Sequence, residues 1–410
     1  MKQRNRNFLG LGGIAAFLLT AVASVSALDW PQYRGPSRDG RSGETGLLKA
    51  WPAEGPKLLW RVPLGDGYSG IAVAGGRLYT LFGAEGGEWL GAFDPASGKS
   101  LWRTRLGENW KDEMGNGPRS TPTVDGDAVF GLGSRGRLVA LEAASGKERW
   151  SVDLAAAFGA QIPQWGVSNS PLVEGDLVML DAGGRPGHSL LAFDKKTGKL
   201  AWASQTDRPG YSSPLAVTAA GVRQVLFFTG SALVSVEPAT GKALWRYPWT
   251  TDYDVNAAMP IAVPDDQIFI SSGYGHGAVM LKVKKQGAGL GVEEVWKSTV
   301  MKNHFNSSVL VAGYLYGFDD GTFKCVDAAT GAEQWKQRGF GKGSLAYADG
   351  NLYVLSDQGA LALVEAKPSS YSEKGRVALF SSRTWTMPTL AQGQVFLRDQ
   401  KELLALKVGA

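Results

Sequence analysis

The nonapeptide DPASGKSLW at residues 94–102 recurs in related form at four later places in the chain. Each copy has an acidic residue, two variable residues, serine or threonine, glycine, three further residues and tryptophan: residues 142–150, 194–202, 237–245 and 327–335. The acid and the hydroxyl can bond to turn amides, and glycine accepts the positive φ that closes a tight turn. The pattern therefore predicts five hairpins, each with its tryptophan on the outgoing strand.

Short alternating strands precede each of these turns, as in residues 77–82 followed by residues 89–93. A further strand near each Ser-Pro or Thr-Pro pair completes a four-stranded unit. The same strand pair continues through degenerate copies, which brings the number of units to eight: residues 267–271 with 278–283, 314–318 with 322–326, 352–355 with 360–364, and 395–398 with 402–406.

Tryptophan marks the last strand of most units. We interpret these side chains as packing between neighbouring units, because their regular placement follows the repeat. In the seventh unit, Phe380 is predicted to take the same place. The seven tryptophans at this position are Trp60, Trp102, Trp150, Trp202, Trp245, Trp296 and Trp335.

The two ends of the repeat region complement each other. The eighth unit, residues 385–410, has three strands, whereas residues 58–62 form a single strand with no partner nearby in sequence. A linear stack would leave two open edges, but a ring closed by the N-terminal strand leaves no long unprotected edge. We predict an all-β fold over residues 58–410: an eight-bladed β-propeller of four-stranded antiparallel blades, in which the N-terminal strand closes the last blade.

The composition agrees with this fold and excludes several kinds of site. The chain has 410 residues, of which 55 are glycine, too many for a helical bundle. The single cysteine excludes a disulfide framework, a four-cysteine zinc site and a C-x-x-C-H haem attachment. We expect Cys325 to fill the core of a strand. The three histidines lack metal-ligand spacing, so no metal ligand is predicted.

Residues 1–27 have the pattern of a signal peptide: three basic residues, an apolar run and the small residues Val25-Ser26-Ala27. An uncleaved anchor and the choice between the general and the twin-arginine export routes stay open. We expect a periplasmic or secreted protein, with residues 28–57 as an N-terminal extension. Cleavage would lower the net charge from +5 to +2, so no nucleic-acid partner is expected. We also expect no stable membrane insertion of the mature chain, and a monomer.

The Asp-x-x-Thr-Gly-Lys-x-x-Trp string resembles the pyrroloquinoline quinone (PQQ) repeat found in quinoprotein dehydrogenases and in the outer-membrane assembly propeller. The opening WPQYRGPSRDG, residues 30–40, resembles the start of a group of exported bacterial PQQ-like propellers of poorly defined function. The resemblance implies the propeller fold, and it leaves enzymatic and binding roles open.

The segments before the innermost strands break the repeat pattern and should line the mouth of the central channel. A funnel of aromatic, amide and cationic side chains suits a flat anionic ligand such as PQQ, a planar tricarboxylate. Alternatively, these side chains bond to loop backbones and to channel water. The predicted site residues are Arg119, Trp165, Asn169, Tyr211, Asn256, His304, Asn306, Lys342 and Trp385.

Two hypotheses about function follow. The first is a binding or interaction scaffold with a protein or a small anionic ligand at a propeller face. The second is a PQQ-dependent quinoprotein dehydrogenase that uses PQQ with Ca²⁺ to oxidise an alcohol or sugar. The resemblance implies that such enzymes carry a vicinal disulfide and a Glu, Asn and Asp set, which this chain does not match. We therefore favour the scaffold and assign no catalytic residue.

Overall fold

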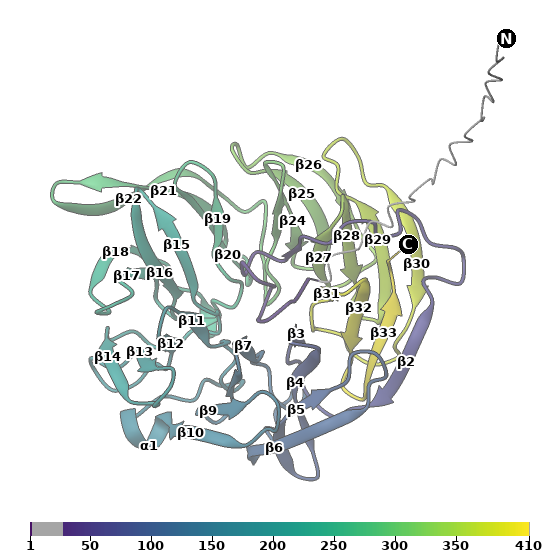
Figure 1. Ribbon diagram of the computed structural model, residues 1–410. Helices are drawn as coiled ribbons and strands as arrows, with labels where there is room; N and C mark the ends of the chain where they lie inside the picture. The colour runs from purple at the N-terminus through teal and green to yellow at the C-terminus, as the bar shows by residue number, and fades with distance from the viewer. Residues whose placement is uncertain (2–27, 410) are drawn as a thin grey trace.

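The computed structural model describes Met1 and residues 28–409, which form eight sheets arranged in a ring (Figure 1). The innermost strands of most neighbouring blades contact one another, for example β3 (Ala72–Ala74) and β7 (Thr123–Asp125), and these inner strands surround the central axis. Within the described residues the helical elements are α1 (Leu154–Phe158) and the short 3₁₀ turn η1 (Asp252–Asp254). The predicted eight-bladed propeller of four-stranded blades is confirmed, with β1 (Arg41–Ser42) added in parallel to the seventh sheet as a fifth strand.

The strands follow one another as an antiparallel meander in every blade. The first four blades contain β3 with β4 (Arg77–Ala84), β5 (Gly87–Phe93) and β6 (Ser100–Glu108); β7 with β8 (Ala128–Leu132), β9 (Arg137–Glu142) and β10 (Glu148–Asp153); β11 (Leu172–Glu174), β12 (Leu177–Asp181), β13 (Leu190–Asp194) and β14 (Leu200–Ser204); and β15 (Leu215–Ala219), β16 (Val222–Phe228), β17 (Ala232–Val236) and β18 (Ala243–Pro248).

The last four blades repeat the arrangement. They contain β19 (Ile261–Val263), β20 (Gln267–Ser272), β21 (Gly277–Gln286) and β22 (Gly289–Ser298); β23 (Val309–Val311), β24 (Tyr314–Asp319), β25 (Thr322–Asp327) and β26 (Glu333–Gln337); β27 (Ser344–Ala348), β28 (Asn351–Leu355), β29 (Ala360–Glu365) and β30 (Glu373–Ala378); and β31 (Thr389–Ala391), β32 (Gln394–Arg398) and β33 (Glu402–Lys407) with β2 (Leu58–Pro63).

The N-terminal strand closes the ring. β2 pairs antiparallel with β33, with Leu58 opposite Leu406 and Pro63 opposite Glu402. The eighth sheet therefore takes its outer strand from the beginning of the chain and its other strands from the end. This pairing confirms the prediction made from residues 58–62.

The repeat tryptophan and glycine form the contact between neighbouring blades. The indole nitrogen of Trp150 donates to the carbonyl oxygen of Lys195 in the next blade at 3.1 Å. Gly198 of that turn lies against the same indole, where a Cβ atom would be only 2.6 Å from Trp150 Cδ2. Glycine is thus required both for its positive φ of 70° and for the ring packed on it. The same pairing joins Trp60 with Gly98, Trp102 with Gly146, Trp202 with Gly241, and Trp296 with Gly331.

The prediction for the seventh blade was wrong. Phe380 lies beyond the end of β30, and Gly375 occupies the tryptophan register, opposite Leu363. Trp51 of the extension fills the space: its ring lies 6.0 Å from Tyr353 at 52°, and its backbone nitrogen donates to the Lys374 carbonyl at 2.9 Å. A Cβ on Gly375 would approach Trp51 Cβ to 2.7 Å. The extension therefore supplies the side chain that this blade lacks.

The extension also blocks the central channel. Trp30 forms an antiparallel bridge with Val73 of the first blade, and β1 (Arg41–Ser42) pairs in parallel with β27 of the seventh. Between these points Arg34 and Arg38, each 2% exposed, donate to carbonyl oxygens at the start of other blades. The acceptors are Ser307 and Ser308 for Arg34, and Ser170, Pro171 and Pro214 for Arg38. Figure 1 shows this purple segment crossing the middle of the ring.

The meander gives the ring two different faces. The connections between blades and the second hairpin of each blade lie on one face, here called the loop face; the repeat turns lie on the opposite repeat face. The extension also contacts first-hairpin turns on the repeat face, since Glu44 accepts from the Gly393 amide at 3.0 Å.

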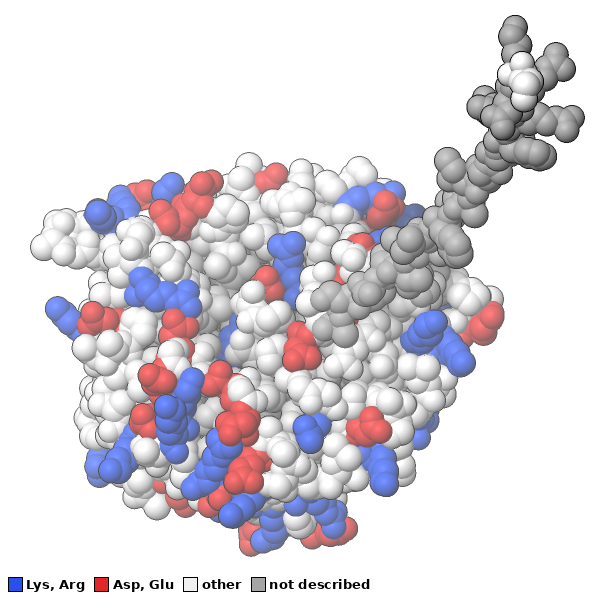
Figure 2. Space-filling view, viewed as in Figure 1, with Lys and Arg blue, Asp and Glu red and all other residues white. Residues whose placement is uncertain are grey.

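The face of the ring visible in Figure 2 carries charged side chains of both signs. The acidic and basic side chains are interspersed around the ring. Within residues 28–409, no helix has the length and apolar character to cross a membrane. The predicted signal peptide, residues 1–27, lies almost entirely outside the described residues.

Candidate functional site

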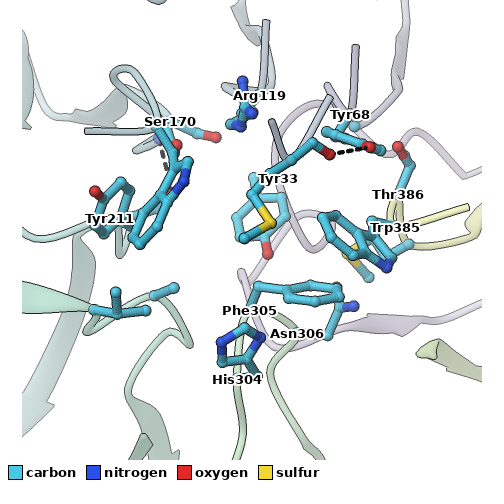
Figure 3. A pocket seen from close by; sticks show the side chains of 18 of the residues that line it. Tyr33, Tyr68, Arg119, Ser170, Tyr211, His304, Phe305, Asn306, Trp385 and Thr386 are labelled. Carbon is cyan, nitrogen blue, oxygen red and sulfur yellow. Dashed lines mark hydrogen bonds between the residues drawn. The ribbon is translucent and has the colours of Figure 1, made fainter. Parts of the chain in front are cut away.

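A cavity of about 170 Å³ lies at the loop-face end of the channel, above the extension. One water needs roughly 10–15 Å³ on this measure, so the cavity can accept several waters or a ligand side chain. Tyr33 contributes to its lining from the extension (Figure 3). The other lining residues come from the connections between blades and one hairpin: Tyr68, Gly70, Met114, Arg119, Trp165, Ser168, Ser170, Tyr211, Ser213, Val255, Ala257, Tyr274, His304, Phe305, Asn306, Trp385, Thr386 and Met387.

Eight side-chain rings in and beside this lining form a continuous series, here called the aromatic collar. Neighbouring ring centroids lie 4.6–6.2 Å apart, within the range of favourable aromatic pairs. In Figure 3, Tyr211 lies across the cavity from Trp385, which contacts Phe305. The collar runs through Tyr211, Trp165, Tyr253, Tyr274, His304, Phe305, Trp385 and Tyr68.

Arg119 is the one cationic residue in the described lining, and its charge is already paired. Its guanidinium forms an ion pair with Asp112 at 2.7 Å and also donates to the carbonyl oxygens of Gly115 and Gly117. Burial lowers the pKa of Arg119, and the Asp112 carboxylate opposes that shift. The guanidinium carbon lies 5.6 Å from the Tyr68 ring centroid. Arg119 therefore packs beside the collar and adds no unpaired positive charge to the cavity.

His304 is neutral at physiological pH. Burial, with the nearby Lys342 cation, lowers its pKa to about 4. Lys342 Nζ lies 3.3 Å from His304 Nδ1, while the Lys342 backbone nitrogen donates to Asp357. Lys342 thus contacts His304 but does not line the cavity.

Two of the predicted asparagines, like Lys342, do not line the cavity. Asn169 and Asn256 are buried beside the cavity and donate to the backbone carbonyls of Asp181 and Thr229, at 2.9 and 2.8 Å. They hold loops in place, as the second interpretation of the funnel expected. Six predicted residues do line the cavity: Arg119, Trp165, Tyr211, His304, Asn306 and Trp385.

Comparison with known proteins identifies the family. The family model described as outer membrane protein assembly factor BamB matches residues 86–337 and 319–408. The chain belongs to this family. This membership confirms the resemblance seen in the repeat.

Individual BamB relatives and quinoproteins are distant in sequence. An outer membrane protein assembly factor BamB of Shewanella oneidensis is 24% identical over 86% of this chain and 88% of its own length. Quinohemoprotein alcohol dehydrogenase ADH IIB of Pseudomonas putida is 30% identical over 40% of the chain, but only 26% of that enzyme is covered. The crystal structure of BamB from Moraxella catarrhalis superposes with a TM-score of 0.60 at 16% identity, covering 86% of this chain and 97% of that one.

The lining of this BamB-family cavity does not fit PQQ with Ca²⁺. Calcium takes six to eight oxygen ligands, usually including carboxylates, and the described lining contains no Asp or Glu. Nor does the described part of the chain contain a cluster of three His, Cys, Asp or Glu side chains suited to a metal. A planar tricarboxylate would face Arg119, whose charge Asp112 already neutralises.

Several lining residues were missed from the sequence. Tyr68 precedes Ser69 just as Arg119 precedes Ser120, and Phe305 follows His304, so both carried a positional signal. Tyr274 lies in a hairpin, which the channel-mouth argument did not include. Tyr33 had no signal, because nothing in the sequence places the extension inside the ring.

Proposed function

We propose that this chain is an exported interaction scaffold that binds a polypeptide partner at the loop face, with the aromatic collar as the contact surface. The collar is the observation that carries the proposal. Tyrosine, tryptophan and arginine are enriched in the energetically important centres of protein interfaces. Membership of a family described by an outer membrane protein assembly factor supports a protein partner.

The ionisable groups of the cavity suit contact better than proton transfer. A general acid or base works best when its pKa is near the operating pH. His304 has its pKa lowered to about 4, and burial raises the pKa of Tyr211 to about 12. Arg119 is held by Asp112. None of these groups is poised to exchange a proton near neutral pH.

A PQQ-dependent dehydrogenase is the second candidate, because ADH IIB shares 30% identity over part of the chain. The two candidates are separated by titrating the purified protein with PQQ and CaCl₂ and then assaying dye reduction with alcohols and sugars. We expect neither a bound-quinone spectrum nor turnover. A saturable quinone spectrum with turnover would replace the scaffold proposal with the enzyme.

The collar itself is tested by capture from periplasmic extract on immobilised protein. The Trp165→Ala, Trp385→Ala double variant should lose a partner that the wild type retains. Leu101→Ala is the control, because Leu101 is 47% exposed on the outer strand β6. Equal capture by all three proteins would count against the loop face. We also propose that the chain is exported and acts as a monomer, either in the periplasm or after secretion.

A further inference from the structure

A second hollow lies beside the collar and is rich in positive charge. It is lined by Arg105, Lys111, Arg135 and Glu108, together with Gly86, Asn109 and Trp110, and is here called the basic pocket. In the described part of the chain, none of its three cations has a carboxylate within ion-pair distance: the pairs found involve other residues. Unlike Arg119 in the cavity, these three cations have no ion pair within the described residues, and together with the single carboxylate of Glu108 they leave the lining with a formal net charge of +2.

One loop separates the basic pocket from the aromatic cavity. Residues 109–122 connect β6 to β7. In this loop Trp110 and Lys111 line the basic pocket, and Met114 and Arg119 line the cavity. Asp112 holds this loop, since it accepts from Trp110 Nε1 at 2.5 Å and pairs with Arg119 at 2.7 Å. The Gly117 amide also donates to the Trp110 carbonyl at 2.9 Å. One hydrogen-bonded loop therefore contributes to both hollows on the same face.

Two tyrosines of the collar are held in an unfavourable backbone conformation. Tyr253 has φ 60° and Tyr274 has φ 53°, and their side chains are 66% and 42% exposed. A left-handed conformation is unfavourable for residues other than glycine, and such strain is often found at functional sites. Here it presents two aromatic rings to solvent beside the cavity mouth.

We propose that the partner segment is an extended peptide carrying a large apolar side chain that enters the aromatic cavity and nearby acidic residues that bind in the basic pocket. This proposal rests on the scaffold function proposed above. A neutral aromatic cavity favours an apolar group, because an unpaired charge would lose its hydration there. Free arginines bind carboxylates through charge-assisted, often bidentate hydrogen bonds. The combination selects for an apolar anchor with acidic neighbours.

Peptide binding followed by intrinsic tryptophan fluorescence tests this directly. The probe is a tryptophan-free synthetic peptide with one phenylalanine flanked by aspartates; two companions replace the phenylalanine with alanine or the aspartates with lysines. We expect saturable binding of the first peptide, weakened by added salt. Each companion should bind at least about tenfold more weakly, as expected for loss of a charge-assisted bond or a buried apolar group.

Protein variants locate the two contacts. Arg105→Glu with Arg135→Glu should weaken the first peptide by about tenfold or more while leaving the alanine-to-phenylalanine difference in place. Arg185→Glu with Arg338→Glu is the matched control, since both arginines are exposed on the loop face, outside the basic pocket, and have no ion pair within the described residues. Trp165→Ala should abolish the preference for phenylalanine.

Three results would overturn the proposal: equal binding of all peptides, equal weakening by the control variant, or binding of phosphatidylglycerol vesicles in place of the peptide. Partner capture that depends on the collar but survives the basic-pocket variant would refute this inference alone and leave the scaffold function standing. Equal capture by the wild type and the Trp165→Ala, Trp385→Ala variant would refute the scaffold function itself.

Discussion

Replacement of Trp51 by alanine should destabilise the propeller by removing the same kind of aromatic packing that a repeat tryptophan provides. Trp51 is 7% exposed, packs on Gly375 and lies 6.0 Å from the Tyr353 ring. Truncation of a buried aromatic side chain to alanine costs about 3–5 kcal/mol. Its backbone bond to Lys374 would survive the change, so the loss comes from the side chain alone. We expect a decrease in unfolding free energy of about 3–5 kcal/mol.

Equilibrium guanidinium unfolding, followed by circular dichroism, measures this loss. Trp335→Ala provides the comparison, because Trp335 is a repeat tryptophan that is 9% exposed and lies 5.9 Å from Tyr316. Leu101→Ala, at a 47% exposed position, should change stability by less than about 0.5 kcal/mol. If Trp51→Ala costs under about 1 kcal/mol while Trp335→Ala costs several, the extension is not part of the core and the reasoning fails.

Three further predictions concern the N-terminal extension, the cavity and the core. Arg38→Met should lower the unfolding free energy by roughly 2–4 kcal/mol, because buried carbonyl oxygens lose their donors; no change in the denaturation midpoint would contradict this. For His304, whose folded pKa of about 4 lies below its ordinary value of 6.5, the unfolded chain binds the proton first as pH falls. Stability should therefore decline from about pH 6.5 towards 4, and His304→Phe should flatten that part of the melting-temperature profile. Cys325 is fully buried, with its thiol pKa raised to about 12; a thiol reagent should label it only as the protein unfolds, and rapid native-state labelling would disprove its burial.

Most of the fold could be predicted because each repeat residue has a local role. Gly198 closes a turn and Trp150 occupies a strand, and both roles follow from the sequence around them. Ring closure could be predicted because residues 58–62 form a strand without a neighbour. In the seventh blade, Trp51 packs at the place where the other blades have their repeat tryptophan. This could not be predicted, because Gly375 and Trp51 are distant in sequence and share no pattern.

The site could be predicted only in outline. Position before an inner strand places a residue near the axis, but it does not give the direction of the side chain. Trp165 lines the cavity, whereas Asn169, four residues later, donates to the Asp181 carbonyl at the end of β12. The lining also depends on Tyr33, whose place follows from the buried bonds of Arg34 and Arg38.

Site-specific photo-crosslinking in cells tests the central claim, that the collar on the loop face binds a polypeptide. A photoreactive phenylalanine replaces Tyr253, which is 66% exposed beside the cavity mouth, and a matched protein carries it at Lys196, an exposed residue of a repeat turn. The account predicts a discrete protein adduct from position 253 that the Trp165→Ala, Trp385→Ala variant abolishes, with none from position 196. Adducts formed only from position 196, or unaffected by loss of the two tryptophans, would contradict it.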